Sequence, residues 1–195
     1  MRPYIDAALD EAANALTKLR NNAAAHDAIE QAAQVFISAF ENGHRLFSCG
    51  NGGSMCDAMH FAEELSGRWR LNRRALGATA ISDVGHLTCV ANDFGYENVF
   101  SRYLEGVART GDVLVGISTS GTSKNILKAC ETARQKGMKV VTLTGKADSP
   151  IGKLADVDIC TPGGQYADRV QELHIKVIHI LIELVERKLC PENYA

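Results

Sequence analysis

Two carboxylates and a histidine occupy one short stretch of the sequence. Asp57, His60 and Glu64 are separated by three and four positions, so a helix would place all three side chains on one face. An imidazole and a carboxylate on one face can bind one metal ion or act on one substrate. From spacing alone, a surface ion pair worth about 0.2–0.5 kcal/mol is the commoner explanation. The position of the stretch, directly after a glycine-rich loop, favours the functional one.

A second polar group lies in a later run that is otherwise rich in Ile, Val and Leu. It comprises Gln171, Glu172, His174 and His179. An unpaired imidazole within such a run would be costly, so His179 is either a hydrogen-bonded core residue or a functional one. Gln171 and His179 lie eight residues apart, which is about 12 Å of helical rise. To share one ligand, their side chains would have to lean towards each other.

A glycine-rich loop, Gly50-Asn51-Gly52-Gly53-Ser54, precedes the first of these groups. Its glycines let the backbone approach a ligand closely. Ser54 and Asp57 have the spacing of a capping box, which predicts a helix that begins directly after the loop. Free N–H groups there suit an anion, although a plain glycine-rich turn explains the loop equally well. The motif is neither GxGxxG nor a P-loop, so it does not imply a nucleotide.

A hydroxyl-rich segment covers residues 118–123, with the sequence Ser-Thr-Ser-Gly-Thr-Ser. Hydroxyls and backbone amides together are good donors to phosphate oxygens. A helix N-cap with solvated neighbours would account for one or two of these side chains, but not for five. The segment therefore predicts a phosphate site that needs no lysine or Mg²⁺, as a sugar phosphate would.

Five short apolar segments rich in β-branched residues are typical of buried parallel strands. They cover residues 45–49, 78–81, 113–117, 140–143 and 157–160, and helical stretches at about 54–67, 84–109 with a break, 122–136 and 149–155 separate them. This alternation predicts a doubly wound α/β fold with a parallel five-stranded sheet. Ligands bind at the carboxyl ends of such strands, which is where both loops lie.

Helices are also expected on both sides of the alternating region. Residues 1–42 have the apolar spacing of two helices, the second closed by Asn42-Gly43. A long helix over about 168–189 is apolar on nearly every face, which suggests a subunit interface. We interpret residues 1–195 as one domain, in which the N-terminal pair (1–42) packs on the core or interface of residues 43–195.

Composition excludes several classes of protein. With 46% hydrophobic and 23% charged residues, the chain has enough apolar surface to fold. A net charge of −2 gives no support to a nucleic-acid binder. No CxxC pair, signal peptide or membrane-spanning run is recognisable, so we expect reduced thiols in a cytoplasmic protein.

Two further groups are ambiguous. The basic cluster Arg68–Arg74, which surrounds Trp69, could contact phosphate, nucleic acid or an acidic partner, but a solvated loop is the commoner case. Asn92-Asp93 could bind hydroxyl groups or could simply end a helical segment.

Taken together, these motifs resemble those of the bacterial phosphoheptose isomerase family, whose subunits have the SIS (sugar isomerase) fold. The matching segments are 48–54, 57–65, 91–95, 116–121 and 171–179. The resemblance implies a cytoplasmic homotetramer that converts D-sedoheptulose 7-phosphate to D-glycero-D-manno-heptose 7-phosphate. That reaction is the first step towards the heptose of the lipopolysaccharide core.

The resemblance also assigns roles to individual residues. It implies a zinc ion bound by His60, Glu64, Gln171 and His179. Implied substrate contacts are Asn51, Gly52, Gly53, Ser54, Glu64, Asn92, Asp93, Ser118, Thr119, Ser120, Ser123 and Gln171. We further expect Glu64 to move the proton between C1 and C2 through an enediol, with His179 as the opposing acid or base.

Two alternative functions remain open at the level of sequence. One is a non-catalytic SIS-domain regulator that binds a replication-initiator protein, and the other is an isomerase of a different sugar phosphate. Retention of all four implied zinc ligands favours the enzyme, and only the Arg68–Arg74 cluster favours the regulator. We expect a sugar phosphate as the ligand and neither membrane nor nucleic acid as a partner.

Overall fold

The computed structural model, which describes residues 1–164 and 166–195, is built on one parallel sheet. Its strands are β1 (Leu46–Cys49), β2 (Ala78–Ala80), β3 (Val113–Ser118), β4 (Lys139–Thr144) and β5 (Val157–Cys160). Their order is β2-β1-β3-β4-β5, and every neighbouring pair is parallel. The predicted doubly wound five-stranded sheet is confirmed, with each strand within one or two residues of its expected position.

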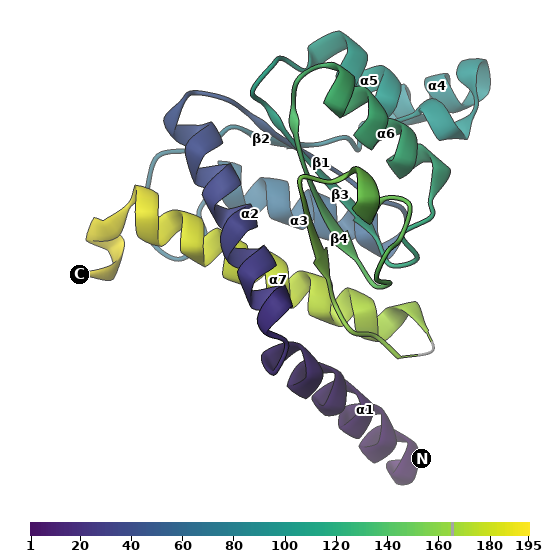
Figure 1. Cartoon of the computed structure of the whole chain (residues 1–195), viewed down its shortest axis with the longest axis vertical. Coiled ribbons are helices and arrows are strands. Elements are labelled where there is room, and N and C mark those ends of the chain that lie inside the picture. The colour runs from purple at the N-terminus through teal and green to yellow at the C-terminus, as the bar shows by residue number, and fades with distance from the viewer. Residues whose placement is uncertain (165) are drawn as a thin grey trace.

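Helices cover both faces of this sheet (Figure 1). They are α1 (Arg2–Arg20), α2 (Ala23–Glu41), α3 (Gly53–Ser66), α4 (Val84–Phe94), α5 (Ser101–Val107), α6 (Lys124–Gln135) and α7 (Ala167–Leu189). Short 3₁₀ turns form η1 (Tyr96–Asn98), η2 (Gly152–Leu154) and η3 (Pro191–Tyr194). The helix expected at 149–155 is therefore only the turn η2.

Each face of the sheet has its own apolar core, because the strands are buried on both sides. One core joins α2, α3 and α7 to strand residues such as Val115 and Val141. The other joins α5 and α6 to residues such as Leu114 and Val140. Alternate residues of one strand thus point into opposite cores. Helices α3 and α7, which carry all four implied zinc ligands, pack beside each other on one face.

The two N-terminal helices are confirmed, and their ends follow ordinary capping rules. The Asn22 side chain accepts a hydrogen bond from the backbone of Ala25 at the start of α2. Asn42 caps the end of α2, and Gly43 follows with a φ of +75°. Helix α1 projects away from the body of the chain (Figure 1), so most of its surface is exposed.

The expectation that the last helix is apolar on nearly every face is wrong. Helix α7 buries one continuous side, which includes Val177, Ile178 and Leu181, and exposes Glu172 and Lys176 on the other. The buried side packs on α2 and α3. Within the described residues, we find no helix with both the length and the apolarity needed to cross a bilayer.

Candidate active site

The loops that follow β1 and β3 lie side by side, because these strands are neighbours with Cys49 opposite Gly116. Two side-chain amides join the loops. Asn51 Nδ2 donates to Asn125 Oδ1 at 2.9 Å, and Asn125 Nδ2 donates to Asn51 Oδ1 at 2.8 Å. The Tyr96 hydroxyl donates to the same Asn51 oxygen at 2.9 Å. The predicted site residue Asn51 is therefore fixed by two residues that the sequence did not single out.

Helix α3 begins one residue earlier than predicted, and the Ser54–Asp57 capping box is wrong. Gly52 is the N-cap, with a φ of +55° that favours glycine, and no side chain caps the helix. Ser54 is buried within the first turn. At Gly53, a Cβ atom would lie 2.6 Å from Gln171 Nε2. The absence of a side chain at Gly53 thus lets the Gln171 amide rest on the first turn of α3.

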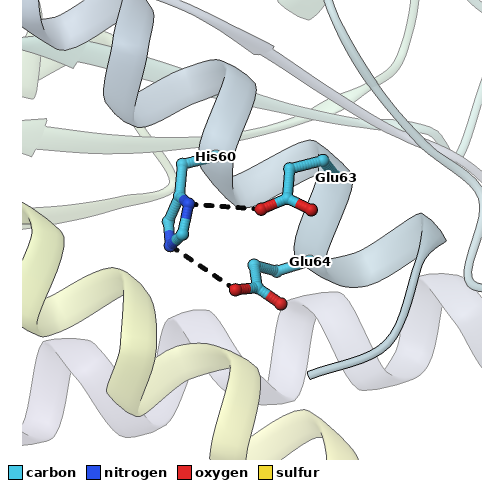
Figure 2. Close-up of side chains that lie close together, drawn as sticks. All are labelled: His60, Glu63 and Glu64. Atoms are coloured by element: carbon cyan, nitrogen blue, oxygen red, sulfur yellow. Dashed lines mark ion pairs between the residues drawn. The ribbon is translucent and has the colours of Figure 1, made fainter. Parts of the chain in front are cut away.

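The imidazole of His60, on α3, contacts side chains of both α3 and α7. Its Nδ1 lies 3.2 Å from Glu63 Oε1, and its Nε2 lies 3.7 Å from Glu64 Oε1 (Figure 2). The same Nε2 is 3.0 Å from Nε2 of His179 on α7. The structure therefore brings together three of the predicted residues, His60, Glu64 and His179. The structure adds Glu63, the neighbour of Glu64 in the sequence, which was not among the predicted site residues.

Burial shifts the protonation of the groups around His60. Desolvation, reinforced by Glu63, raises the pKa of Glu64 above its ordinary value. Desolvation also lowers the pKa of His179, and the neighbouring His60 adds to that effect. Asp57, one turn before His60, has its pKa raised by burial to about 6, and its Oδ2 is buried without a hydrogen-bond partner among the described residues. Perturbed groups gathered in one place are typical of functional sites.

Trp69 covers the His179 side of the cluster. Its ring centroid lies 4.8 Å from that of His179, with 44° between the planes. The guanidinium carbon of half-exposed Arg70 also lies over the Trp69 ring, 5.6 Å from its centroid. The loop that contains the basic cluster therefore packs against the site. The expectation of a solvated loop is confirmed for Arg68, Arg70 and Arg74, which are exposed. It is wrong for Arg73, whose side chain is completely buried.

The hydroxyl-rich segment leads from the end of β3 to the start of α6. Ser118 Oγ lies 3.4 Å from Ser120 Oγ and 3.1 Å from Ser123 Oγ, so three hydroxyls face one another. Thr119 and Ser120 line a cavity of about 180 Å³ that α7 closes on its far side. Several neutral donors thus converge at a helix N-terminus, which is an arrangement suited to phosphate.

Asn92 and Asp93 are exposed at the end of α4 and are occupied by each other. Asn92 Nδ2 donates to Asp93 Oδ1 at 2.7 Å, and Cys89 Sγ lies 3.6 Å from Asp93 Oδ2. Helix α4 ends at the next residue, in keeping with a helix-ending role. Among the described residues, no side-chain bond joins Asn92 or Asp93 to the other predicted site residues, although nearby Tyr96 bonds to Asn51.

The donor set around His60 fits a metal such as zinc, which binds imidazole nitrogen and carboxylate oxygen. Ligand atoms of His60, Glu63 and Glu64 lie within 4.8 Å of one another. His179 adds a second imidazole nitrogen at His60 Nε2. Gln171, in the second turn of α7, lies against Gly53 in the first turn of α3, next to the loop that holds Asn51.

Comparison with known proteins first defines the class. The family model described as "SIS domain" matches residues 9–145, which include the sheet as far as β4 and both candidate loops.

Curated relatives then narrow the class. A phosphoheptose isomerase of Serratia proteamaculans is 61% identical over 93% of this chain and 94% of its own. One of Photorhabdus laumondii is 60% identical over the same shares. A solved phosphoheptose isomerase from Neisseria gonorrhoeae superposes with a TM-score of 0.88 at 34% identity, covering 95% of this chain and 98% of its own. The chain belongs to the phosphoheptose isomerase family of SIS-domain proteins.

Proposed function

We propose that the chain is an aldose–ketose isomerase that converts D-sedoheptulose 7-phosphate to D-glycero-D-manno-heptose 7-phosphate. The observation that carries the proposal is the position of His60 Nε2, 3.7 Å from a carboxylate of α3 and 3.0 Å from an imidazole of α7. Similarity to the isomerases of Serratia and Photorhabdus supports the choice of substrate. The product would feed heptose into the lipopolysaccharide core, and the reaction would take place in the cytoplasm.

Glu64 is the proposed base of this reaction. Its carboxylate removes a proton from C1 of the ketose, which leaves an enediolate with its charge on O2. Once O2 has gained a proton and O1 has lost one, the carboxylic acid returns its proton to C2 to give the aldose. The pKa of Glu64 is raised towards neutral pH, and a group whose pKa lies near the working pH can both accept and return a proton. One base on one face of the sugar is sufficient, because the proton moves only between adjacent carbons.

His179 is the proposed partner of Glu64, acting on the sugar oxygens. Its lowered pKa keeps the imidazole neutral at pH 7, so that it can both accept and donate a proton. The hydroxyls of Ser118, Thr119, Ser120 and Ser123 would bind the phosphate. Binding energy gained there holds C1 and C2 against Glu64 during the reaction.

The expected metal is zinc, held by His60, Glu64 and His179, with Gln171 as the fourth implied ligand. When bound, it would polarise the carbonyl and stabilise negative charge on the enediolate oxygens. A carboxylate would be less basic when it binds a metal, so the proposed role of Glu64 as base applies to the carboxylate that is free of the ion.

The test of the proposed function is turnover of sedoheptulose 7-phosphate, followed by the appearance of the aldose phosphate. Glu64→Gln should lower kcat by about 10²–10⁴-fold, the usual contribution of a general base, and leave substrate binding intact. Glu63→Gln is the matched control, since it removes the neighbouring carboxylate from the other nitrogen of His60. Near-normal turnover in Glu64→Gln would exclude Glu64 as the base. No turnover by the unaltered protein would exclude the function.

A homotetramer is the proposed assembly, and the exposed face of α1 supports it. Leu9 and Leu16 are 64% and 42% exposed, and Tyr4 and Ile5 continue the same apolar stripe. A groove of about 380 Å³ between α1 and α7 reaches His179. Exposed apolar surface of this kind marks interfaces between proteins. Light scattering should give the mass of four chains, and Leu9→Glu should reduce it, whereas Asp6→Asn should not.

A further inference from the structure

Arg73 has an unusual environment for an arginine in a surface loop. Its side chain is fully buried, and every guanidinium nitrogen is engaged. Nε donates to Glu186 Oε1 at 2.6 Å, Nη2 donates to the Glu64 carbonyl at 2.7 Å, and Nη1 donates to the carbonyls of Leu65, Gly67 and Arg74 at 2.8, 3.1 and 3.1 Å. One side chain thus bonds the end of α3, its own loop and α7.

These contacts fall where α3 needs partners. The last carbonyls of a helix have no intrahelical donor, and α3 ends at Ser66 without a left-handed glycine, since Gly67 has a φ of −90°. Arg73 supplies a donor to the Glu64 carbonyl. It also donates to the Leu65 carbonyl, which accepts from the backbone N–H of Leu76 as well. The backbone carbonyl of Glu64, whose side chain faces His60, is therefore held directly by this guanidinium.

Glu186 anchors the other end of the contact. It lies on α7, is 1% exposed, and accepts from Arg73 through Oε1 and from the Tyr194 hydroxyl through Oε2 at 3.0 Å. Both carboxylate oxygens therefore have donors. Glu186 lies two turns beyond His179 on the same helix, so the ion pair ties the helix of Glu64 to the helix of His179.

We propose that Arg73, through its buried pair with Glu186, is a positioning residue for the isomerisation, because it fixes the end of α3 that carries Glu64 against α7, which carries His179. The proposal rests on the proposed roles of Glu64 and His179. Arg73 lies at the end of α3 remote from the loops that would hold the phosphate, so it acts on the proton transfer and not on binding. A displacement of reacting groups by about 1 Å can cost 10²-fold in rate.

A role in stability alone makes a different prediction. Replacing a buried ion pair with apolar residues of similar volume is often neutral or stabilising, whereas removing one partner leaves a buried charge. The double variant Arg73→Met/Glu186→Met therefore separates the two roles. It should fold with a Tm close to that of the unaltered protein, and yet it loses the four bonds to the backbone carbonyls of α3 and its loop.

The experiment measures kcat, KM and Tm for this double variant, with sedoheptulose 7-phosphate as substrate. We expect kcat to fall at least tenfold, with KM within threefold of the unaltered protein. Arg70→Met is the matched control, because Arg70 pairs with Glu183 across the same loop and helix at 3.0 Å but is half exposed. It should keep its kcat. A double variant with unchanged kcat would overturn the proposal.

Two further variants keep the test decisive if the double variant is less stable than expected. Arg73→Lys retains the charge but not the fork of donors, so its kcat should lie between those of the unaltered protein and the double variant. Val185→Ala weakens the core of α7 next to Glu186 and leaves the pair intact. If it lowers kcat as much as the Arg73 variants at an equal loss of Tm, the effect is one of stability and the proposal fails. Turnover by the unaltered protein, measured in the same assay, tests the proposed function separately.

Discussion

The imidazoles of His60 and His179, 119 residues apart in the chain, face each other with their Nε2 atoms 3.0 Å apart. At this distance two N–H groups would repel, so one Nε2 must present its lone pair to the other. The pair therefore holds either one shared proton or one cation between the two rings. The protonation state of the two histidines therefore depends on whether a proton or a cation lies between them.

If the occupant is zinc, then protein stripped of metal should gain stability on adding zinc alone. Binding at 100 times Kd raises the free energy of unfolding by about 2.7 kcal/mol, which a thermal melt detects readily. His60→Ala and His179→Ala should each abolish most of this gain. His26→Ala, on α2 and outside the site, is the control. An equal gain in all four proteins would place the metal elsewhere.

Trp69 provides an optical probe of His179, because it is the only tryptophan in the chain and its ring packs on that imidazole. A protonated imidazole quenches indole fluorescence more strongly than a neutral one. Since the pKa of His179 is lowered by burial, quenching should develop only below the ordinary histidine value of 6.5. The titration is read with chelator present. His179→Gln should remove the transition, and a midpoint above 6.5 would contradict the assignment.

Asp57 should make the fold more stable in acid than at neutral pH, so far as this group alone is concerned. Its pKa rises from 3.8 to about 6 on folding, so the folded state binds the proton more tightly. Stability therefore falls as the pH rises through this window, and the cost of burying the charge is fully present above it. Asp57→Asn should raise the urea midpoint at pH 7.5 but not at about pH 4. Asp10→Asn, on exposed α1, controls for charge, and an equal shift at both pH values would contradict the assignment.

Asn125 should matter for substrate binding although it is almost fully buried. Its amide pair with Asn51 joins the glycine-rich loop to the hydroxyl-rich one. Asn125→Ala leaves Asn51 with fewer partners, which should cost about 1–3 kcal/mol of stability and raise KM several-fold. Asn193→Ala, which removes an exposed amide bond to the carbonyl of Asn72, should leave KM unchanged. A KM unaffected by Asn125→Ala would mean that the two loops are positioned independently.

The local pattern was sufficient to predict the strands and the loops after them. Runs such as Val113–Ile117 are apolar on both faces. This pattern is contained in the run itself, so it can be recognised without knowing any contact with distant parts of the chain. The same reasoning failed at Ser54, because a glycine with positive φ at position 52 starts the helix before the serine can cap it. It also failed at Arg73. A charge in a loop is normally solvated, and only contact with α7, far along the chain, buries it.

Candidate site residues could be predicted where their spacing within one helix places them on the same face, as for His60 and Glu64. The meeting of His60 with His179 required the resemblance to a family, since no local pattern links α3 to α7. Tyr96 and Asn125 were missed for the same reason: each acts through a side-chain bond to Asn51. Asn125 lies two residues after the hydroxyl-rich segment, and this closeness to the loop is the one signal in the sequence that points to it.

Helix α7 follows all five strands in the chain, and it alone supplies His179, Gln171 and the partner of Arg73. During synthesis the sheet-forming segments therefore emerge before α7, although a domain generally folds as one unit. A nascent chain that has formed its strands and the proposed phosphate site at residues 118–123 would still lack His179, one half of the proposed acid–base pair. Under the proposed mechanism, the chain would therefore become able to react with sugars only after α7 has docked, and activity would indicate that folding is complete.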